Sequence, residues 1–350
     1  MKILGIDTSC DDTCVSIIAI TNPKSQIPNF EIISNVVSSQ VKLHAKYGGV
    51  YPSLAKREHQ KNLPVVFKKT TRKIDISKVD LIGVTVGPGL EPCLWTGVNF
   101  AKELAEKFTL QIIPVNHVEA HIYANFLNYE PRRCDLFPAV CLVVSGGHTQ
   151  LILMPDYGKY KILGETRDDA AGECFDKAAR ILGLGYPGGP VIEASASEVN
   201  INRGRASIRL PRPMIYQKNY DFSFSGLKTA VLYDFRSRSS KIRKSKEYIR
   251  AMCAEIQQAI IDVLIHKTLK AAKNFKAKSV ILGGGVVAND ELRKQFQEKI
   301  QKEIPDTKYL IPDTKFCTDN AAMVAATAYF HREEATKNWQ KIKVNANLKI

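Results

Sequence analysis

One pattern constrains the fold most: two apolar runs on either side of a short polar or glycine-rich turn, and it occurs twice. The first copy, within residues 2–20, reads KILGID, TSCDD and CVSIIAI. The second copy, within residues 138–154, reads PAVCLVV, SGGHT and QLILM. Short apolar runs bounded by turn residues are typical of β-strands. Two strand–turn–strand units of the same kind predict a duplicated lobe.

Strands and helices alternate along the rest of the chain. We predict strands in DLIGVTV (80–86), which ends in GPGL, and in SVILGGGVVAND (279–290), where the strand runs into three glycines. Residues 251–274 carry an apolar stripe with a period near 3.6, which predicts an amphipathic helix that packs on the core. Asp319 and Asn320 precede the alanine-rich AAMVAATAYF and are suited to cap a helix there. This alternation predicts an α/β fold.

A chain of 350 residues exceeds the size that one hydrophobic core usually supports, so we expect two lobes. The predicted N-terminal lobe spans 1–134 and the C-terminal lobe spans 135–316. A helical segment over 317–350 is expected to carry Asp319 back to the cleft between the lobes.

The sequence also predicts a soluble, cytoplasmic protein. No apolar run approaches the roughly 20 residues that span a bilayer, and Asp7 comes too early for a signal peptide. The eight cysteines are scattered without a CxxC pair, which favours reduced thiols over disulfides or a zinc–cysteine site.

The net charge of +15 favours a polyanionic partner, either nucleic acid or a membrane surface. A genome that encodes lysine liberally would explain the charge equally well. The densest basic cluster is RSRSSKIRKSKEYIR (236–250), which we call the basic segment. It is poor in apolar residues, so we expect a solvated loop or helix face that can contact phosphates.

Two glycine-rich turns, SGGHT (145–149) and LGGGVVAN (282–289), follow predicted strands. Such turns let backbone N–H groups approach an anion, although each alone is equally explained as a tight turn. Neither matches a P-loop or a dinucleotide-binding fingerprint. Together with TSCDD they follow the plan of the actin-like ATPase (ASKHA) fold. In that fold two lobes, each built on an RNase H-like mixed sheet with flanking helices, clasp a nucleotide phosphate.

A possible metal site lies in NHVEAH (116–121). On a helix, His117 and His121 are about 40° apart, so both imidazoles can reach one ion, whereas Glu119 faces the other way. A zinc protease of the H-E-x-x-H type needs glutamate directly after the first histidine, and Val118 stands there. Two histidines alone are more simply explained by ordinary hydrogen bonds. A third ligand must come from elsewhere, and Asp319 at a helix start is a candidate.

With these motifs the chain resembles the TsaD family, the tRNA threonylcarbamoyladenosine synthases once described as O-sialoglycoprotein endopeptidases. Three positions depart from the common family pattern: Asn116, Ala120 and Tyr51 stand where many members have histidine, glycine and valine. The matching stretches span nearly the whole chain: GIDTSCDDT (5–13), GGVYPSLAKREH (48–59), VTVGPGL (84–90), NHVEAH (116–121), LVVSGGHTQL (142–151), DDAAGECFDKAARILGLGYPGGP (168–190), FSFSGLKTAV (222–231), GGGVVAN (283–289) and CTDNAAM (317–323).

The resemblance implies one divalent metal ion, usually iron(II) with zinc also possible, held by His117, His121 and Asp319. Such a 2-His-1-carboxylate set leaves coordination positions open for a substrate oxygen. The resemblance also implies a group of residues that bind the adenylate: Val143, Val144, Ser145, Gly146, Gly147, Asp176, Gly189 and Asn289. Two of these have structural alternatives, because Asp176 can pair with Lys177 or Arg180 and Asn289 can cap a helix.

The implied reaction moves a threonylcarbamoyl group from threonylcarbamoyl-AMP to N6 of adenine 37 in tRNAs that read codons beginning with adenine, releasing AMP. Backbone amides at 145–148 are placed to stabilise developing negative charge, and no residue is assigned as general base. The implied partners are tRNA and, in bacteria, the TsaB and TsaE proteins. Two other classes remain: a metalloprotease, and an actin-like small-molecule kinase or nucleotide-binding regulator that needs neither histidine.

Overall fold

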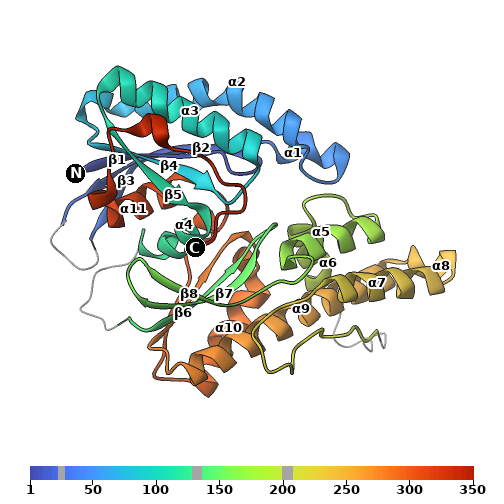
Figure 1. Cartoon of the computed structure of the whole chain (residues 1–350). Helices are drawn as coiled ribbons and strands as arrows, with labels where there is room; N and C mark the ends of the chain where they lie inside the picture. Colours follow the sequence, from blue (N-terminus) through green and yellow to red (C-terminus); the bar gives the residue numbers. More distant parts are fainter. Residues whose placement is uncertain (23–27, 128–135, 199–207) are drawn as a thin grey trace. The chain divides into compact units, whose positions relative to one another are not determined.

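A computed structural model describes residues 1–22, 28–127, 136–198 and 208–350 of the chain. The chain divides into two compact units (Figure 1). Unit 1 comprises Met1–Asp135, Tyr157–Lys159 and Ile311–Ile350, and unit 2 comprises Leu136–Asp156 and Tyr160–Leu310. Each unit contains a five-stranded sheet with both parallel and antiparallel pairs, and each sheet includes one copy of the repeated strand–turn–strand pattern. The predicted duplication and the α/β class are confirmed.

The sheet of unit 1 has the strand order β3-β2-β1-β4-β5. Strands β1 to β3 are antiparallel neighbours, whereas β4 runs parallel to β1 and β5 runs parallel to β4. TSCDD forms the turn between the first two strands, as predicted. The strands are β1 (Lys2–Asp7), β2 (Asp12–Ile20), β3 (Phe30–Ser39), β4 (Leu81–Gly87) and β5 (Gln111–Asn116).

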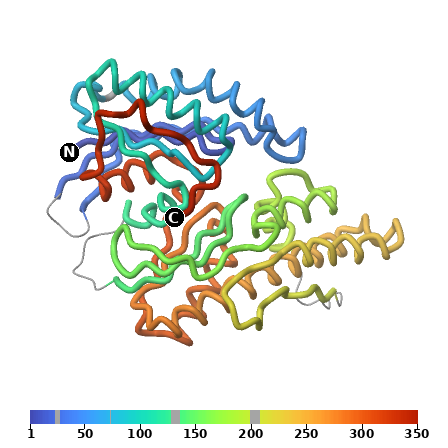
Figure 2. Tube along the Cα trace, viewed as in Figure 1, coloured from blue at the N-terminus to red at the C-terminus, as the bar shows by residue number. Residues whose placement is uncertain are grey.

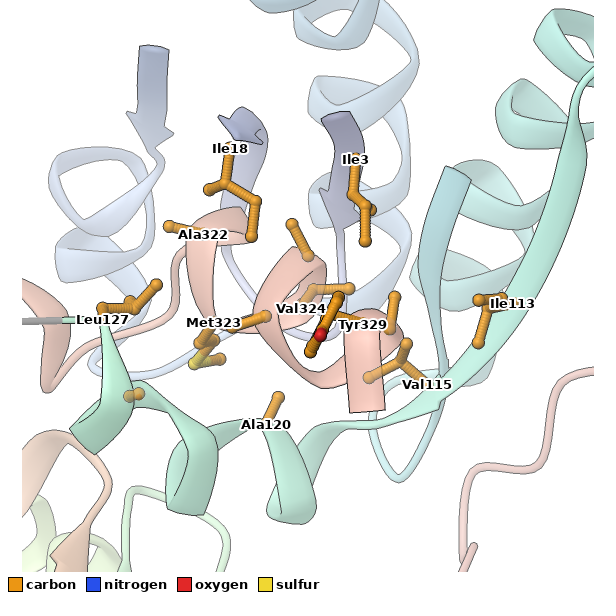
Figure 3. Close-up of a cluster of buried hydrophobic side chains, with 14 of the residues drawn as sticks. Ile3, Ile18, Ile113, Val115, Ala120, Leu127, Ala322, Met323, Val324 and Tyr329 are labelled. Carbon is orange, nitrogen blue, oxygen red and sulfur yellow. The ribbon is translucent and has the colours of Figure 1, made fainter. Parts of the chain in front are cut away.

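Successive side chains of a strand point to opposite faces of a sheet. In this sheet the side chains on both faces are apolar, and helices cover both faces. On one face Leu4 packs in a cluster with residues of α2 and α3. On the other face Ile3 packs in a cluster with residues of α4 and α11, which Figure 3 shows. Both faces of β1 are therefore buried. The helices of unit 1 are α1 (Val41–His44), α2 (Pro52–Thr70), α3 (Glu91–Phe108), α4 (His117–Tyr123) and α11 (Ala321–Phe330).

The sheet of unit 2 has the strand order β10-β9-β6-β7-β8, with β6 and β7 antiparallel and β9 parallel to both β6 and β10. The predicted helix over 251–274 lies within the long helix α9 (Lys246–Asn274). The strands are β6 (Ala139–Val144), β7 (Thr149–Asp156), β8 (Lys159–Glu165), β9 (Ser279–Gly283) and β10 (Lys308–Leu310). The helices are α5 (Ala171–Leu182), α6 (Gly188–Ser197), α7 (Ser225–Ser237), α8 (Ser240–Arg243), α9 (Lys246–Asn274) and α10 (Asp290–Glu303).

The C-terminal segment returns to unit 1 and follows it to the end of the chain, as the red trace in Figure 2 shows. The N–H of Asn345 donates to the carbonyl of Val86 over 2.8 Å, and the N–H of Gly89 donates to the carbonyl of Ala346 over 3.1 Å. The last residues therefore pack on the end of β4 and on the loop that follows it.

Two predictions about the chain as a whole can be compared with the described residues. The seven cysteines among them are free thiols, as predicted, and Cys134 lies outside this part of the chain. Within the same residues, every helix is too short or too polar to cross a bilayer.

Candidate metal centre

The position of α4 is set by a strong N-terminal cap. The Asn116 side-chain oxygen accepts hydrogen bonds from the N–H groups of Val118 at 2.9 Å and Glu119 at 3.2 Å. This satisfies two of the N–H groups that a helix start leaves without partners. The helix therefore begins at His117, and His121 follows one turn later on the same side.

Asp319 lies just before α11, whose start is fixed in the same way. The Asn320 side-chain oxygen accepts from the N–H of Met323 at 3.0 Å, which confirms the predicted cap. The backbone of this helix start lies directly on β1, because a Cβ added at Gly5 would collide with the carbonyl oxygen of Ala321. Glycine at this position lets the helix approach β1, and so brings Asp319 close to the end of that strand.

The structure brings the three predicted ligands together, two from α4 and one from the segment just before α11. One carboxylate oxygen of Asp319, Oδ1, lies 3.4 Å from Nε2 of His117 and 3.4 Å from Nε2 of His121. The two imidazole rings are 4.7 Å apart, with an angle of 77° between their planes. One ligand atom from each residue can be chosen so that all lie within 4.8 Å of one another. This group of two nitrogens and one oxygen could hold a metal ion.

His121 gives an independent test of whether a metal fits. Its side chain is 1% exposed, and among the described residues neither ring nitrogen has a hydrogen-bond partner of good geometry. A buried polar atom without a partner costs free energy, and a metal ion at Nε2 would supply one. Burial also lowers the pKa of His121, so the ring is neutral and offers a lone pair at neutral pH. The residues therefore fit a divalent metal.

Asp7 is a residue of this site that the sequence analysis missed. Its fully buried carboxylate accepts from Nδ1 of His117 at 3.0 Å through Oδ2, and from the N–H of Ser9 at 2.8 Å through Oδ1. A carboxylate at Nδ1 keeps a proton on that nitrogen and leaves Nε2 as the metal-binding atom. Its position at the carboxyl end of a buried strand is the sequence signal that could have indicated this role.

The same carboxylates control the charge of His117. Burial alone would lower the pKa of this ring, but the negative charges of Asp319 and Asp7 raise the pKa well above its ordinary value. These charges therefore favour the ring that carries a proton on both nitrogens when no metal is bound. A metal can bind at Nε2 only when that nitrogen carries no proton.

Two further acids lie where β2 begins: Asp11 in the turn after β1, and Asp12 as the first residue of β2. Burial raises the pKa of Asp12 to about 7, and the nearby charge of Asp319 adds to this effect. Burial and the same charge also raise the pKa of Asp11. Neither residue was assigned a role from the sequence, and in both the raised pKa favours the neutral acid next to the charge of Asp319.

Glu119 points away from the two histidines, as the helical phase predicts. Its Oε1 lies 2.7 Å from Nε2 of His331, at the end of α11. The hydrogen bond to Glu119 raises the pKa of His331 to about 9, against the opposing effect of burial. Glu119 therefore links α4 to α11 and has no part in the ligand group.

The predicted adenylate-binding residues all lie in unit 2. Val143 and Val144 end β6, and the turn that follows is closed by a 2.8 Å hydrogen bond from the Ser145 N–H to the His148 carbonyl. A Cβ placed on Gly146 or Gly147 would meet no atom within 4 Å, so the backbone of this turn is open to a ligand.

Three other predicted residues have different surroundings. Asp176 accepts a hydrogen bond from the Gly188 N–H at 2.7 Å, and a Cβ on Gly189 would meet no atom within 4 Å. Asn289 caps α10, because its oxygen accepts from the Leu292 N–H at 2.8 Å. Its amide nitrogen donates to Gln257 at 2.8 Å. Both ends of the Asn289 side chain therefore have structural partners.

Solved structures define the class of fold. HypF of T. kodakarensis matches with a TM-score of 0.56 at 13% identity, over 95% of this chain and 48% of that chain. Component A of the (R)-2-hydroxyglutaryl-CoA dehydratase of Acidaminococcus fermentans matches with a TM-score of 0.51 at 13% identity, over 95% and 99%. The chain has the actin-like ATPase (ASKHA) fold that the repeated hairpins predict.

The sequence comparisons define the family. The TsaD family, described as tRNA N6-adenosine threonylcarbamoyltransferase, matches residues 31–326. Curated proteins of that name include one from Thermosipho africanus, 44% identical over 100% of both chains. Another, from Thermosipho melanesiensis, is 47% identical over 94% of each. The chain belongs to the TsaD family and is an enzyme of the acyltransferase class, as the resemblance predicts.

Proposed function

We propose that this chain transfers the threonylcarbamoyl group of threonylcarbamoyl-AMP to N6 of adenine 37 in tRNAs that read codons beginning with adenine. AMP is the leaving group. The observation that carries the proposal is the convergence of His117, His121 and Asp319 in a chain that matches its relatives over its whole length. The metalloprotease alternative is disfavoured because Val118 occupies the position of the protease glutamate.

The chemistry explains why an activated donor is needed. The N6 amine of adenine is a weak nucleophile, because its lone pair is delocalised into the ring. In the adenylate the carbonyl carbon is bonded to a phosphate oxygen, which leaves readily as AMP. The new bond joins N6 to that carbon, the carbon–oxygen bond breaks, and N6 loses one proton. A divalent ion at the ligand group, iron(II) or zinc, would supply Lewis-acid polarisation of a donor oxygen.

Residues of this chain are assigned to two tasks. In unit 1, Asp7 holds the proton of His117 on Nδ1, so that Nε2 faces the ligand group. In unit 2, the open turn at 145–148 offers backbone N–H groups to the negative charge that develops on the donor. Asp176 and Gly189 are assigned to the nucleoside part of the donor, since a carboxylate accepts hydrogen bonds from ribose hydroxyls.

The basic segment is assigned to the tRNA backbone. It covers the end of α7, all of α8 and the start of α9, and most of its cationic side chains are exposed, as predicted. Arg238 pairs with Asp234 at 2.8 Å, and the Arg243 guanidinium lies 5.6 Å from the centre of the Phe235 ring. The contacts hold these two groups in place while leaving the charge near the surface. We also propose a cytoplasmic location and TsaB-like and TsaE-like partner proteins.

The test supplies threonylcarbamoyl-AMP and an unmodified tRNA with adenine beside the anticodon. Modified nucleoside is measured by mass spectrometry, with and without TsaB and TsaE. Bound metal is measured on protein purified without oxygen. We expect His121→Ala to lose both metal and product, while His266→Ala, an exposed histidine of unit 2, keeps both. Full product formation by metal-free His121→Ala protein would refute the assigned site. ATP turnover that is independent of both histidines would favour a kinase-like function instead.

A further inference from the structure

Two exposed tyrosines stack on each other at the entrance to α2. Tyr47 is 60% exposed and Tyr51 is 56% exposed. Their ring centres are 5.8 Å apart and their planes differ by 30°. Aromatic rings in a folded protein usually bury most of their surface. A stacked pair that stays in solvent instead presents a flat aromatic surface to a ligand.

The backbone of Tyr51 is linked by a hydrogen-bond network to the turn between β1 and β2. The Tyr51 N–H lies 3.3 Å from Nδ1 of His44, and Nε2 of His44 lies 3.1 Å from the Gln40 side-chain oxygen. The N–H of Gln40 in turn donates to the carbonyl of Asp11 at 3.0 Å. Asp11 belongs to the acidic turn beside Asp319. Tyr51 is therefore anchored to the turn that borders the metal group, and Tyr47 stacks on its ring.

One glycine, Gly48, makes the backbone turn between Tyr47 and Tyr51 possible. Gly48 has φ of +64°, in the left-handed region, and its N–H donates to the carbonyl of Ala45 at 3.1 Å. Glycine adopts this conformation without steric cost, which lets the chain reverse after the short helix Ala45–Tyr47. The stacked arrangement is therefore part of a defined turn.

The charge around the pair identifies the chemistry of its ligand. Residues 40–61 contain five lysines and arginines and a single acid, Glu58. Lys42, Lys46 and Lys56 are exposed. Protein–protein interfaces are enriched in tyrosine but depleted in lysine. Aromatic side chains beside cations are instead typical of surfaces that bind single-stranded nucleic acid, where bases stack on rings and phosphates contact lysines.

We propose that Tyr47 and Tyr51 form a stacking platform for an unpaired base of the RNA substrate, with Lys42 and Lys46 contacting the adjoining phosphates. The inference rests on the proposed function, because transfer to an adenine amine requires that base to be turned out of its loop. Tyr51 stands where many TsaD members have valine, so the paired ring is a feature of this chain.

The test measures binding of an anticodon stem-loop RNA in which 2-aminopurine replaces the target adenine. Affinity and fluorescence quenching are followed together at fixed salt. The double variant Tyr47→Leu with Tyr51→Val removes both rings, and Tyr47→Phe with Tyr51→Phe keeps them. Tyr216→Leu is the matched control, because Tyr216 is 84% exposed and lies in unit 2. Circular dichroism and thermal melting verify that each variant is folded.

We expect the double variant without rings to bind about tenfold more weakly and to lose most of the quenching, as removal of a base–aromatic stack predicts. The phenylalanine variant and the Tyr216 control should behave as the wild type does. Wild-type affinity and quenching in the folded double variant would overturn the platform. A second result would also overturn the platform. If the double variant binds RNA normally and its product formation falls only in assays that contain the partner proteins, the rings contact a protein.

The outcomes separate this inference from the proposed reaction. If tyrosine-dependent RNA binding is found but the wild type forms no modified nucleoside, the platform stands and the transfer reaction is wrong. If the wild type forms the nucleoside and the double variant binds RNA normally, the reaction stands and the platform is wrong. A wild-type chain with no affinity for RNA overturns both.

Discussion

Replacement of Asp7 by asparagine tests whether this carboxylate sets the metal-binding state of His117. The carboxylate uses one oxygen for the Ser9 N–H and the other for His117 Nδ1. Asparagine has nearly the same size but only one acceptor oxygen. If that oxygen accepts from Ser9, the amide N–H faces Nδ1 of His117. The ring then carries its proton on Nε2, which is the wrong tautomer for a metal ligand.

The size of the effect follows from the burial of this contact. Loss of a partner that orients a ligating histidine typically weakens metal binding 10- to 100-fold, which is about 1.4 to 2.7 kcal/mol. Asp7 is fully buried, so water cannot replace the missing acceptor. We therefore expect Asp7→Asn to fall near the upper end of this range.

Metal affinity is measured by competition with a chelator, using zinc in air and iron(II) without oxygen. The matched control is Asp80→Asn in the same unit, where an exposed carboxylate accepts from the Lys2 N–H at 2.6 Å. We expect the control to bind metal as the wild type does. Thermal unfolding of the metal-free proteins separates a loss of affinity from a loss of fold. A folded Asp7→Asn protein with wild-type metal affinity would refute the reasoning.

Three more predictions concern packing, pH and salt. Gly5→Ala should lower the free energy of unfolding by about 3 kcal/mol in denaturant titrations, because its Cβ would displace the start of α11. Gly189→Ala, with open space around it, should cost far less, and equal losses would contradict this account. The pKa of His331 is raised from 6.5 to about 9, so its ion pair stabilises the fold below pH 6.5 and that stability is lost as pH rises through 9. Solvent screening reduces this effect. In urea titrations we expect His331→Gln to be about 1 kcal/mol less stable than wild type at pH 6 and nearly as stable as wild type at pH 10. A stability difference that does not depend on pH would contradict the assigned ion pair. Neutralising the four cations at positions 236, 238, 241 and 243 of the basic segment should weaken tRNA binding and lower its log–log salt slope by up to about 0.9 per lost phosphate contact, whereas an unchanged slope would discard this surface.

Much of the fold follows from short-range patterns. The runs around TSCDD and SGGHT predicted two antiparallel hairpins, and both hairpins are present. The cap at Asn320 was also predicted, because a side-chain acceptor next to an apolar helix satisfies N–H groups only three residues away. The helical spacing of His117 and His121 likewise depends on local geometry alone. Such features are determined by neighbours in the sequence.

The candidate site needed the tertiary structure, because its members are distant in the sequence. Asp7 ends a strand, His117 begins a helix in the middle of the chain, and Asp319 precedes the last α-helix. Residue types alone gave no reason to pair Asp7 with His117. They also did not show that Asn289 caps α10 with its oxygen and donates to Gln257 with its amide nitrogen. The sequence by itself determined which segments become strands and helices and which histidines share a face. Only the tertiary structure decided that the Asp319 carboxylate meets those histidines. The reason is that α11 packs directly against β1, where Gly5 leaves room for a backbone carbonyl of the helix.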